Sequence, residues 1–260
     1  MKEKLLEILQ KEVAPALGCT GPTSVSFAAA KAHAVIGGTV EKVKVIMDRD
    51  TYKNSISVGI PGTTYKGLEV AAAVGAVGGD ADKGLEVLTG LTKEHEEVSL
   101  KKISDGDVQI EIAWDRDGMG LFIDAYVYTE NGCGRAIVYG THTNVVYLEC
   151  NGKCIFGSLD DAKNTVYQLD APISAFTIHD FIEFARTVSG DELSMIQEAV
   201  KLNFALTEAG LSARAGSGFG AGWSKLDQNN VVYRARAAAA AAGDARMSGK
   251  DLPAMSCASS

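Results

Sequence analysis

The fold is decided within residues 20–47, which read TGPTSVSFAAAKAHAVIGGTVEKVKVIM. Thr20 is a suitable N-cap, and Pro22 falls in a first helical turn, where its missing N–H costs nothing. Small residues then continue to a Gly-Gly pair, so the first half predicts a helix over about 21–36. From Val40 apolar residues alternate with polar ones, which is typical of a strand. A helix followed directly by a strand indicates a protein that mixes the two structures.

Regular alternation of apolar and polar residues recurs beyond that stretch. It is cleanest over 108–114 and weaker over several segments up to about residue 150. Helical patterns over 68–77 and 84–91 lie between the predicted strands. The middle of the chain, about 40–160, therefore predicts a largely antiparallel sheet with helices on one face.

Both ends of the chain are helical in pattern. Apolar residues form one stripe over 3–13, and helical periodicity returns in three later segments: 179–188, 193–208 and 229–247. The last contains six consecutive alanines, which we expect to pack closely against the small-residue helix 21–36. We therefore predict an α+β protein in which residues 1–38 and 165–260 form a helical domain, with an α+β domain inserted at 40–160.

The composition is that of a soluble globular protein with an acidic surface. The chain has 260 residues, 46% of them hydrophobic and 22% charged, and a net charge of −8. Nucleic acids and anionic membranes select basic surfaces, so we expect neither as a partner. No apolar run approaches the ~20 residues of a membrane span, and the amino terminus has no signal-peptide pattern. We expect a cytoplasmic protein whose five cysteines do not form disulfides.

Two cysteines have neighbouring residues that suit a reactive or metal-binding thiol. Cys19 lies at the predicted start of a helix, where the positive end of the helix dipole and unpaired amides favour a thiolate. This suits a nucleophile, a metal ligand or an iron–sulfur ligand, although the spacing alone slightly favours the alternative, a small buried thiol in a tight loop. Cys257 follows Pro253 among small hydroxyl residues, in a loop that we expect to enter a further helix. The final residues do not resemble a natural end, so we expect the chain to be a fragment.

Cys150 and Cys154 have a spacing that resembles a chelate, but the residues between them argue otherwise. Asn151-Gly152 is a favoured two-residue hairpin turn. Cys150 would then pair with the first residue after the turn, and Cys154 with the residue before Cys150. Adjacent cross-strand pairs point to opposite faces of a sheet, so the two sulfurs should diverge.

The four histidines show no zinc-hydrolase spacing. His142 lies between two predicted strands and is the best placed for acid–base chemistry; a turn histidine with satisfied hydrogen bonds is the alternative. Residues 216–222, GSGFGAG, fit a dinucleotide-binding glycine pattern, but they follow a helix rather than a strand. A flexible loop between helices is the better interpretation.

Several segments together resemble the L-cysteine desulfidase family, whose members are related to iron–sulfur L-serine dehydratases. The matching segments are PALGCTGP (15–22), IPGT (60–63), THTN (141–144) with NG (151–152), and AAAAAGDARM (238–247) leading into PAMSC (253–257). They occur in the family's order along the whole chain. The first and last are specific, whereas the middle segments are weak individually. Where the family usually carries an acid, this chain has Gly21.

The resemblance implies an enzyme and a cofactor. Family members use an oxygen-sensitive [4Fe–4S] cluster to eliminate the β-substituent of an L-amino acid, so that cysteine gives sulfide, ammonia and pyruvate, and serine gives water in place of sulfide. By resemblance, Cys19 and Cys257 match two cluster ligands, with a third expected beyond Ser260. The Thr20 helix start would offer amides to the substrate carboxylate.

Other residues receive roles by the same resemblance. Asp244 and Arg246 would orient the substrate ammonium and carboxylate, and His142 matches a histidine that reaches toward the site. We expect a small amino-acid substrate, a homodimer, and no turnover by this chain alone. The alternative is a cluster-free small-molecule-binding or regulatory protein of the same fold.

Overall fold

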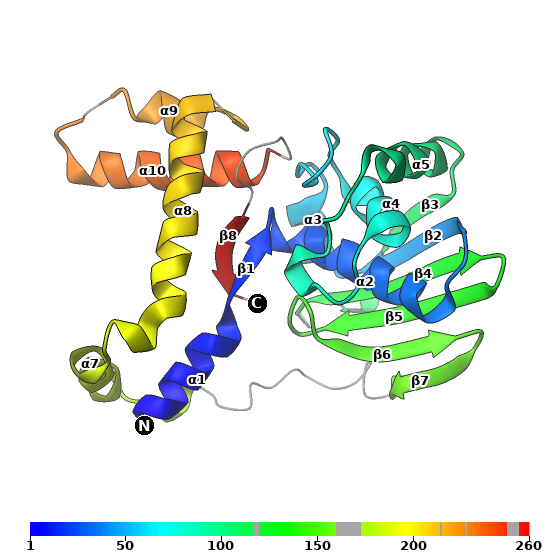
Figure 1. Cartoon of the computed structure of the whole chain (residues 1–260), viewed down its shortest axis with the longest axis horizontal. Helices are drawn as coiled ribbons and strands as arrows, with labels where there is room; N and C mark the ends of the chain where they lie inside the picture. Colours follow the sequence, from blue (N-terminus) through cyan, green and yellow to red (C-terminus); the bar gives the residue numbers. More distant parts are fainter. Residues whose placement is uncertain (117–119, 160–172, 214, 227, 249–254, 260) are drawn as a thin grey trace.

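The computed structural model describes residues 1–116, 120–159, 173–213, 215–226, 228–248 and 255–259. It has the predicted α+β architecture, with a sheet-containing half and a helical half (Figure 1). Both chain ends contribute to the helical half, as predicted. Lys2 near the amino terminus pairs with Glu192 at 2.6 Å, and residues 13–17 pair with residues 255–259.

A six-stranded sheet forms the centre of the first half. Its order is β3-β2-β4-β5-β6-β7, and each neighbouring pair is antiparallel except the parallel pair of β2 and β3. The strands are β2 (Val40–Met47), β3 (Val108–Ile112), β4 (Phe122–Thr129), β5 (Gly132–Tyr139), β6 (Val145–Cys150) and β7 (Lys153–Gly157).

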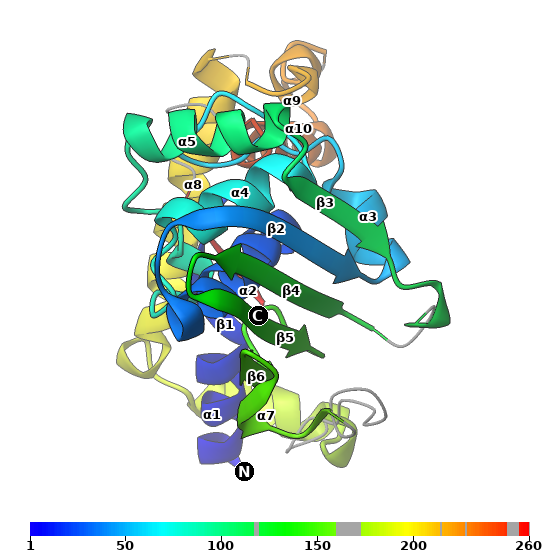
Figure 2. The same ribbon diagram turned by 90° about the vertical axis from the view of Figure 1, so that its right-hand side faces the viewer.

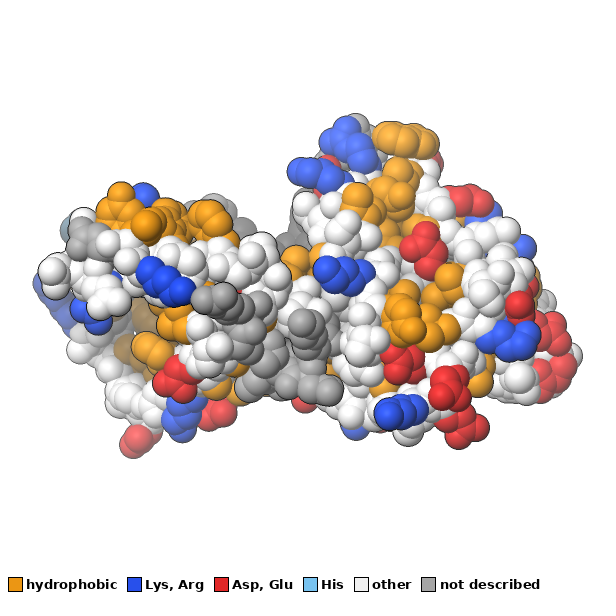
Figure 3. Space-filling view, turned by 90° about the horizontal axis from the view of Figure 1, so that it is seen from above, with side chains coloured by type: hydrophobic (Ala, Val, Ile, Leu, Met, Phe, Trp, Pro, Cys, Tyr) orange, Lys and Arg blue, Asp and Glu red, His pale blue; other side chains and the backbone are white. Residues whose placement is uncertain are grey.

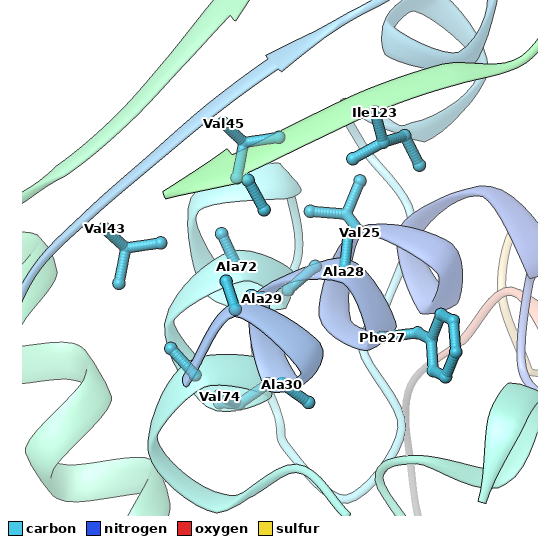
Figure 4. Close-up of a cluster of buried hydrophobic side chains, with 14 of the residues drawn as sticks. Val25, Phe27, Ala28, Ala29, Ala30, Val43, Val45, Ala72, Val74 and Ile123 are labelled. Atoms are coloured by element: carbon cyan, nitrogen blue, oxygen red, sulfur yellow. The ribbon is translucent and has the colours of Figure 1, made fainter. Parts of the chain in front are cut away.

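Helices cover one face of this sheet (Figure 2). The long helix α2 (Thr20–Ile36) packs against β4 and β5 and against α4 (Leu68–Gly78), with α5 (Lys93–Ser104) beside α4. The short helix α3 (Arg49–Ser55) follows β2 directly. Figure 4 shows how the alanines of α2 lie under branched strand residues. Small residues on the helix let it approach the sheet closely, so the branched side chains pack without gaps.

The helical half is built from both ends of the chain. It contains α1 (Lys2–Glu12), β1 (Val13–Leu17), α7 (Ile178–Thr187), α8 (Ser194–Ala213), α9 (Phe219–Trp223), α10 (Val231–Arg246) and β8 (Met255–Ser259). Short 3-10 turns complete the described elements: Gly84–Glu86, Trp114–Arg116, Ile173–Ala175 and Asp191–Leu193. The predicted domain boundaries near residues 38 and 165 stay predictions.

The predicted partner of the alanine tract is wrong. Helix α2 packs on the sheet and on α4, where a Cβ at Gly75 would collide with the backbone of Ser26. The alanine-rich α10 packs instead on α8 and α9, whose Gly210 and Gly220 both approach the backbone of Ala241. Small residues specify a close approach, but they do not specify which small-residue surface is approached.

Two other predicted elements differ from the structure. The helical pattern over 84–91 forms only the 3-10 turn Gly84–Glu86. The segment around Cys257, expected to be a loop entering a helix, is the strand β8. Its pairing partner β1 lies far away in sequence, so no local pattern could indicate the strand.

We expect Gly75→Ala to lower the free energy of unfolding. The new methyl group would overlap the backbone of Ser26 where α4 meets α2, and overpacking of this kind costs about 1–3 kcal/mol. Gly243→Ala is the matched control, because nothing lies within 4 Å of a Cβ there. An open helical position gains about 0.5–1 kcal/mol from that change. Urea unfolding of both variants checks the pair, and an unchanged midpoint for Gly75→Ala would contradict the described packing.

Exposed apolar side chains occur on both halves of the face drawn in Figure 3. On the helical half, Phe219, Leu226 and Val231 are 59%, 68% and 72% exposed. Exposed apolar patches commonly mark contact surfaces. Among the described helices, none combines the length and apolar character that a membrane crossing requires.

Candidate functional site

The candidate site is built around the turn between β1 and α2, residues 17–20, here called the cysteine turn. Gly18 in this turn has φ +72°, a backbone conformation that other residues rarely adopt. A Cβ at Gly18 would also collide with the ring of Pro61. The glycine therefore allows the loop containing residues 60–63 to lie directly against the cysteine turn.

The end of α10 is hydrogen-bonded to the cysteine turn and to the loop before Pro61. Arg246 donates from Nε to the carbonyl oxygen of Gly18 at 2.7 Å. The next residue, Met247, accepts at its carbonyl oxygen from the amide of Gly59 at 3.0 Å. Helix α10 thus contacts both the cysteine turn and the loop before Pro61, although the sequence separates Gly18 and Arg246 by 228 residues.

The segments of the two predicted ligand cysteines are neighbours. Strands β1 and β8 pair antiparallel, with Cys257 opposite Pro15 and Met255 opposite Leu17. Cys19 lies two residues beyond the end of β1. The side chain of Cys257 lies outside what the structure describes, so its distance from the Cys19 thiol stays a prediction.

Helix α2 begins one residue earlier than predicted, with Cys19 rather than Thr20 as its N-cap. The Cys19 side chain makes no capping hydrogen bond. The amides of Thr20 and Gly21 belong to a first turn, which has no intrahelical acceptors, and Pro22 has no amide hydrogen. The Thr23 hydroxyl stabilises the turn, because its Oγ1 lies within hydrogen-bond distance of two carbonyl oxygens, that of Leu17 at 2.9 Å and that of Cys19 at 2.7 Å. This end of α2 therefore presents donors beside a thiol.

His142 approaches the start of α2 from the sheet. Ser24 on α2 donates its hydroxyl to the His142 carbonyl oxygen at 2.6 Å. The imidazole Nδ1 is buried and has no hydrogen-bond partner. Burial lowers the pKa of His142, the positive charge of Arg246 lowers it further, and the negative charge of Asp48 opposes both. The imidazole is therefore neutral at neutral pH, with an unpaired nitrogen.

Asp244 has partners that the sequence did not indicate. Its carboxylate accepts from the amide and hydroxyl of Ser217 at 3.0 and 2.7 Å, and from the amide of Gly220 at 3.0 Å. Burial acts to raise the pKa of Asp244, but these hydrogen bonds outweigh it and the pKa is lowered. Asp244 thus holds the glycine-rich loop at the start of α9 between two helices. Its predicted role at a substrate ammonium stays a prediction.

We expect Asp244→Ala to destabilise the glycine-rich loop at the start of α9. The Gly220 amide lies in a buried residue, and leaving it unsatisfied should cost about 1–3 kcal/mol, whereas the exposed Ser217 amide can bond to water instead. Because the folded-state pKa is lowered, the carboxylate stabilises the fold above the ordinary aspartate pKa, and that contribution is lost as pH falls through the lowered value. Amide hydrogen exchange over 217–223 should accelerate in Asp244→Ala and stay unchanged in Glu208→Ala on exposed α8. Equal protection in both variants would contradict the assignment.

Two residues that lie beside the site, Asp48 and Ser55, were missed from the sequence. Asp48 caps α3 by accepting from the Thr51 amide at 2.8 Å, and it also accepts from the Phe122 amide at 2.9 Å. Its position directly after a strand was the only available signal. Ser55 is fully buried, and its Oγ has no hydrogen-bond partner. A Cβ on Gly21 would lie 2.6 Å from that oxygen. Helix α3 therefore occupies the space that an acidic side chain at position 21 would need.

The hairpin prediction for the central cysteines is confirmed. Cys150 pairs with Lys153, and Cys154 pairs with Glu149, so the two side chains start on opposite faces. Throughout the part of the chain that the structure describes, no three histidine, cysteine or acidic side chains are grouped to hold a metal.

The donors at the cysteine turn fit part of an iron–sulfur site. A cubane cluster takes its protein ligands from cysteine thiolates. The pairing of β1 with β8 brings two cysteine-containing segments together, and the free amides at the start of α2 suit a negatively charged group. Within the described residues only Cys19 has a placed thiol near this turn. A complete cluster site would need further thiolates besides that of Cys19.

The comparisons place this chain beside proteins that carry the name UPF0597. It is 35% identical to the UPF0597 protein of Clostridium tetani over 257 residues, covering 98% of this chain and 60% of that protein. A UPF0597 protein of Clostridium botulinum is 36% identical over 261 residues, with 96% and 59% covered. The Caldanaerobacter subterraneus protein is 38% identical over 256 residues, with 98% and 60% covered.

The chain spans about three fifths of the length of these relatives. No protein-family model matches it, and no solved structure matches it. The names of these relatives state no reaction.

Proposed function

We propose that this chain is part of an iron–sulfur-dependent β-eliminating lyase. Its substrate would be L-cysteine, or a close β-substituted L-amino acid such as L-serine. The products would be pyruvate and ammonia, with sulfide or water. The main support is the convergence on the cysteine turn of the segments that resemble L-cysteine desulfidases. Pro61, Arg246 and β8 contact that turn or its strand, and His142 contacts α2 beside it.

The proposed cofactor is a [4Fe–4S] cluster held by Cys19, Cys257 and a cysteine outside this chain. When bound, such a cluster supplies a Lewis-acidic iron that withdraws electron density from the leaving group. The remaining steps are assigned to this chain's own residues.

The substrate carboxylate would be bound at the start of α2. The amides of Thr20 and Gly21 donate there, and the helix dipole favours a negative charge. Arg246 adds a positive charge whose Nε is already fixed on Gly18. Its terminal nitrogens would bind the substrate carboxylate. These contacts would orient Cα toward the sheet side of the turn.

His142 is the proposed base. Its neutral, partly buried imidazole would remove the Cα proton, the electron pair would form the Cα–Cβ double bond, and the Cβ–S bond would break to release sulfide. Water then hydrolyses the aminoacrylate to pyruvate and ammonia. A base whose pKa lies below its ordinary value is unprotonated at working pH, which general-base catalysis requires.

Replacing Cys19 tests the proposal. The whole protein, purified without oxygen, should be brown, contain iron and release sulfide from L-cysteine. Cys19→Ala should lose the colour and the activity together, whereas Cys150→Ala on β6 should retain both. The 260-residue chain alone should show no turnover. Equal sulfide release by the wild type and Cys19→Ala under strict anaerobiosis would reject the mechanism.

The alternative is a cluster-free protein of the same fold that binds a small molecule. It needs only donors that the structure places at the cysteine turn, such as Arg246 and the first amides of α2. A colourless whole protein that binds an amino acid stoichiometrically, without turnover, would establish this alternative.

The expected location and assembly also belong to the proposal. The acidic composition and the unpaired described cysteines suit the reducing cytoplasm. The exposed apolar side chains of α9 and α10 suit an interface such as that of a homodimer. Sedimentation of the whole protein distinguishes monomer from dimer.

A further inference from the structure

A second small site lies beside α3, away from the cysteine turn. A cavity of about 150 Å³ opens where β2 ends and β4 begins. Figure 2 shows α3 at that end of the two strands. Side chains from α3 and from the segment before β4 line it: Asp48, Arg49, Asp50, Thr51, Asn54, Arg116 and Leu121, with Gly120.

The lining carries both signs of charge and no net charge. Two acidic residues, Asp48 and Asp50, and two arginines, Arg49 and Arg116, line the same space. Arg49 pairs with Asp50 at 3.4 Å, and Asp48 accepts the two backbone amides described above. Asp48 and Arg116 are only 4% and 5% exposed, so their charges are poorly screened by water. Such a lining complements a ligand that carries one positive and one negative group. It is less suited to a simple anion or a simple cation.

The volume limits the ligand further. About 150 Å³ corresponds to roughly five water molecules at ~30 Å³ each. Sites for nucleotides and drug-sized molecules are commonly about 300–1,000 Å³. Charge and size together select a small zwitterion, and a small α-amino acid has both properties.

Helix α3 separates this cavity from the proposed active site. Thr51 and Asn54 line the cavity. On the α2 side, a Cβ at Gly21 would lie 3.7 Å from Thr51 Cγ2 and 2.6 Å from Ser55 Oγ. Asp48 links the same helix to β4 through the Thr51 and Phe122 amides. A group bound in the cavity would therefore press on a helix whose other side touches the first turn of α2.

We propose that the cavity beside α3 is a second binding site for a small α-amino acid, and that its occupation shifts α3 against the first turn of α2. Arg116 would receive the ligand carboxylate, and Asp48 with Asp50 the ammonium. The proposed binding of an amino acid is argued only from the charge and volume of the cavity. The coupling part rests on the proposed function, because it assigns the α2 start to the substrate.

Binding by the 260-residue chain tests the first part. L-serine is the probe, with acetate and ethylammonium as ligands that carry only one of its charges. Calorimetry should detect L-serine and neither single-charge ligand. Asn54→Phe fills the cavity with an aromatic ring and should weaken L-serine binding at least about tenfold. Lys53→Phe adds the same ring to the neighbouring exposed position outside the lining, and binding should stay within about twofold of wild type.

Amide NMR shifts separate this inference from the proposed active site. Saturation with L-serine should move the amides of Thr51, Asn54 and Phe122, and also that of Gly21. Asn54→Phe should abolish the shifts of Thr51 and Phe122 and should reduce the shift of Gly21 to what direct binding at the start of α2 produces. Shifts confined to Thr20 and Gly21 that survive Asn54→Phe would overturn the cavity site while supporting the cysteine turn. Cavity shifts that leave Gly21 unmoved would overturn the coupling. Equal binding of acetate would overturn the zwitterion assignment.

Discussion

Substituting His142 by asparagine should lower sulfide release by the whole protein by about 10²–10⁴-fold, the usual contribution of a general base. Asparagine keeps the backbone carbonyl that Ser24 binds at 2.6 Å, so the contact between the sheet and α2 is retained. The variant replaces the imidazole with an amide group, which does not accept a proton at neutral pH. Binding of a substrate analogue should therefore change little while kcat falls. His33→Asn is the matched control, because His33 lies near the other end of α2, where its ring contacts the Gly38 carbonyl oxygen.

The pH dependence should identify the same residue. Burial and the charge of Arg246 lower the pKa of His142, so the acid limb of the activity profile should lie below the ordinary histidine value near 6.5. Arg246→Gln removes the positive charge and should move the limb toward higher pH. The imidazole proton signals of His142 report the same shift without turnover. An acid limb that is unchanged in Arg246→Gln, together with undiminished kcat in His142→Asn, would exclude the histidine as base.

The same lowered pKa makes a prediction for stability. The folded protein binds the His142 proton less readily than the unfolded chain, so the stabilising contribution is present above the ordinary histidine pKa. It is lost progressively as pH falls from that value toward the lowered one. His142→Asn should remove this part of the acid destabilisation.

Asp124→Ala should produce the largest loss of stability in the sheet. Arg135 on β5 donates from Nε and Nη2 to the two oxygens of Asp124 on β4, at 2.8 Å each. The two side chains are only 11% and 7% exposed. Glu149 lies farther from the guanidinium, at 3.7 Å. Removing the carboxylate would leave a buried charge without its main partner, which costs about 3–5 kcal/mol.

Urea unfolding checks this expectation against two references. Asp105→Ala breaks an exposed ion pair of 2.6 Å with Lys101 at the end of α5 and should have no measurable effect. The double variant Asp124→Leu, Arg135→Met removes both buried charges and should be far more stable than Asp124→Ala alone. A double variant that is no more stable would show that packing, rather than the orphaned charge, determines the loss.

Local signals predicted much of the fold. The helix over 21–36 and the strand from Val40 were found within about a residue because a capping turn, a proline and a Gly-Gly stop define them in sequence. The turn at Asn151-Gly152 likewise fixed the register of β6 and β7. In each case the determining residues are neighbours along the chain.

What the sequence did not predict depends on distant contacts. The alanines of α10 are equally suited to any small-residue surface, and only the structure shows Gly210 and Gly220 against Ala241. Cys19 was identified from its helix start, but its neighbours Pro61 and Arg246 are brought there by tertiary folding. Ser55 carries no sequence signal, since a single serine has no characteristic spacing.

The pairing of β1 with β8 has a consequence for the order in which the protein folds. The paired residues are about 240 positions apart, so this contact closes a very long loop and forms only after β8 has been made. At ~5–20 residues per second, a ribosome needs about 12–48 s to cover that distance. The six-stranded sheet and α2 lie entirely within residues 20–157 and can be complete well before then. The nascent chain therefore carries a finished sheet while Cys19 still lacks its β8 neighbour, which makes assembly of the cysteine turn a late step of biosynthesis.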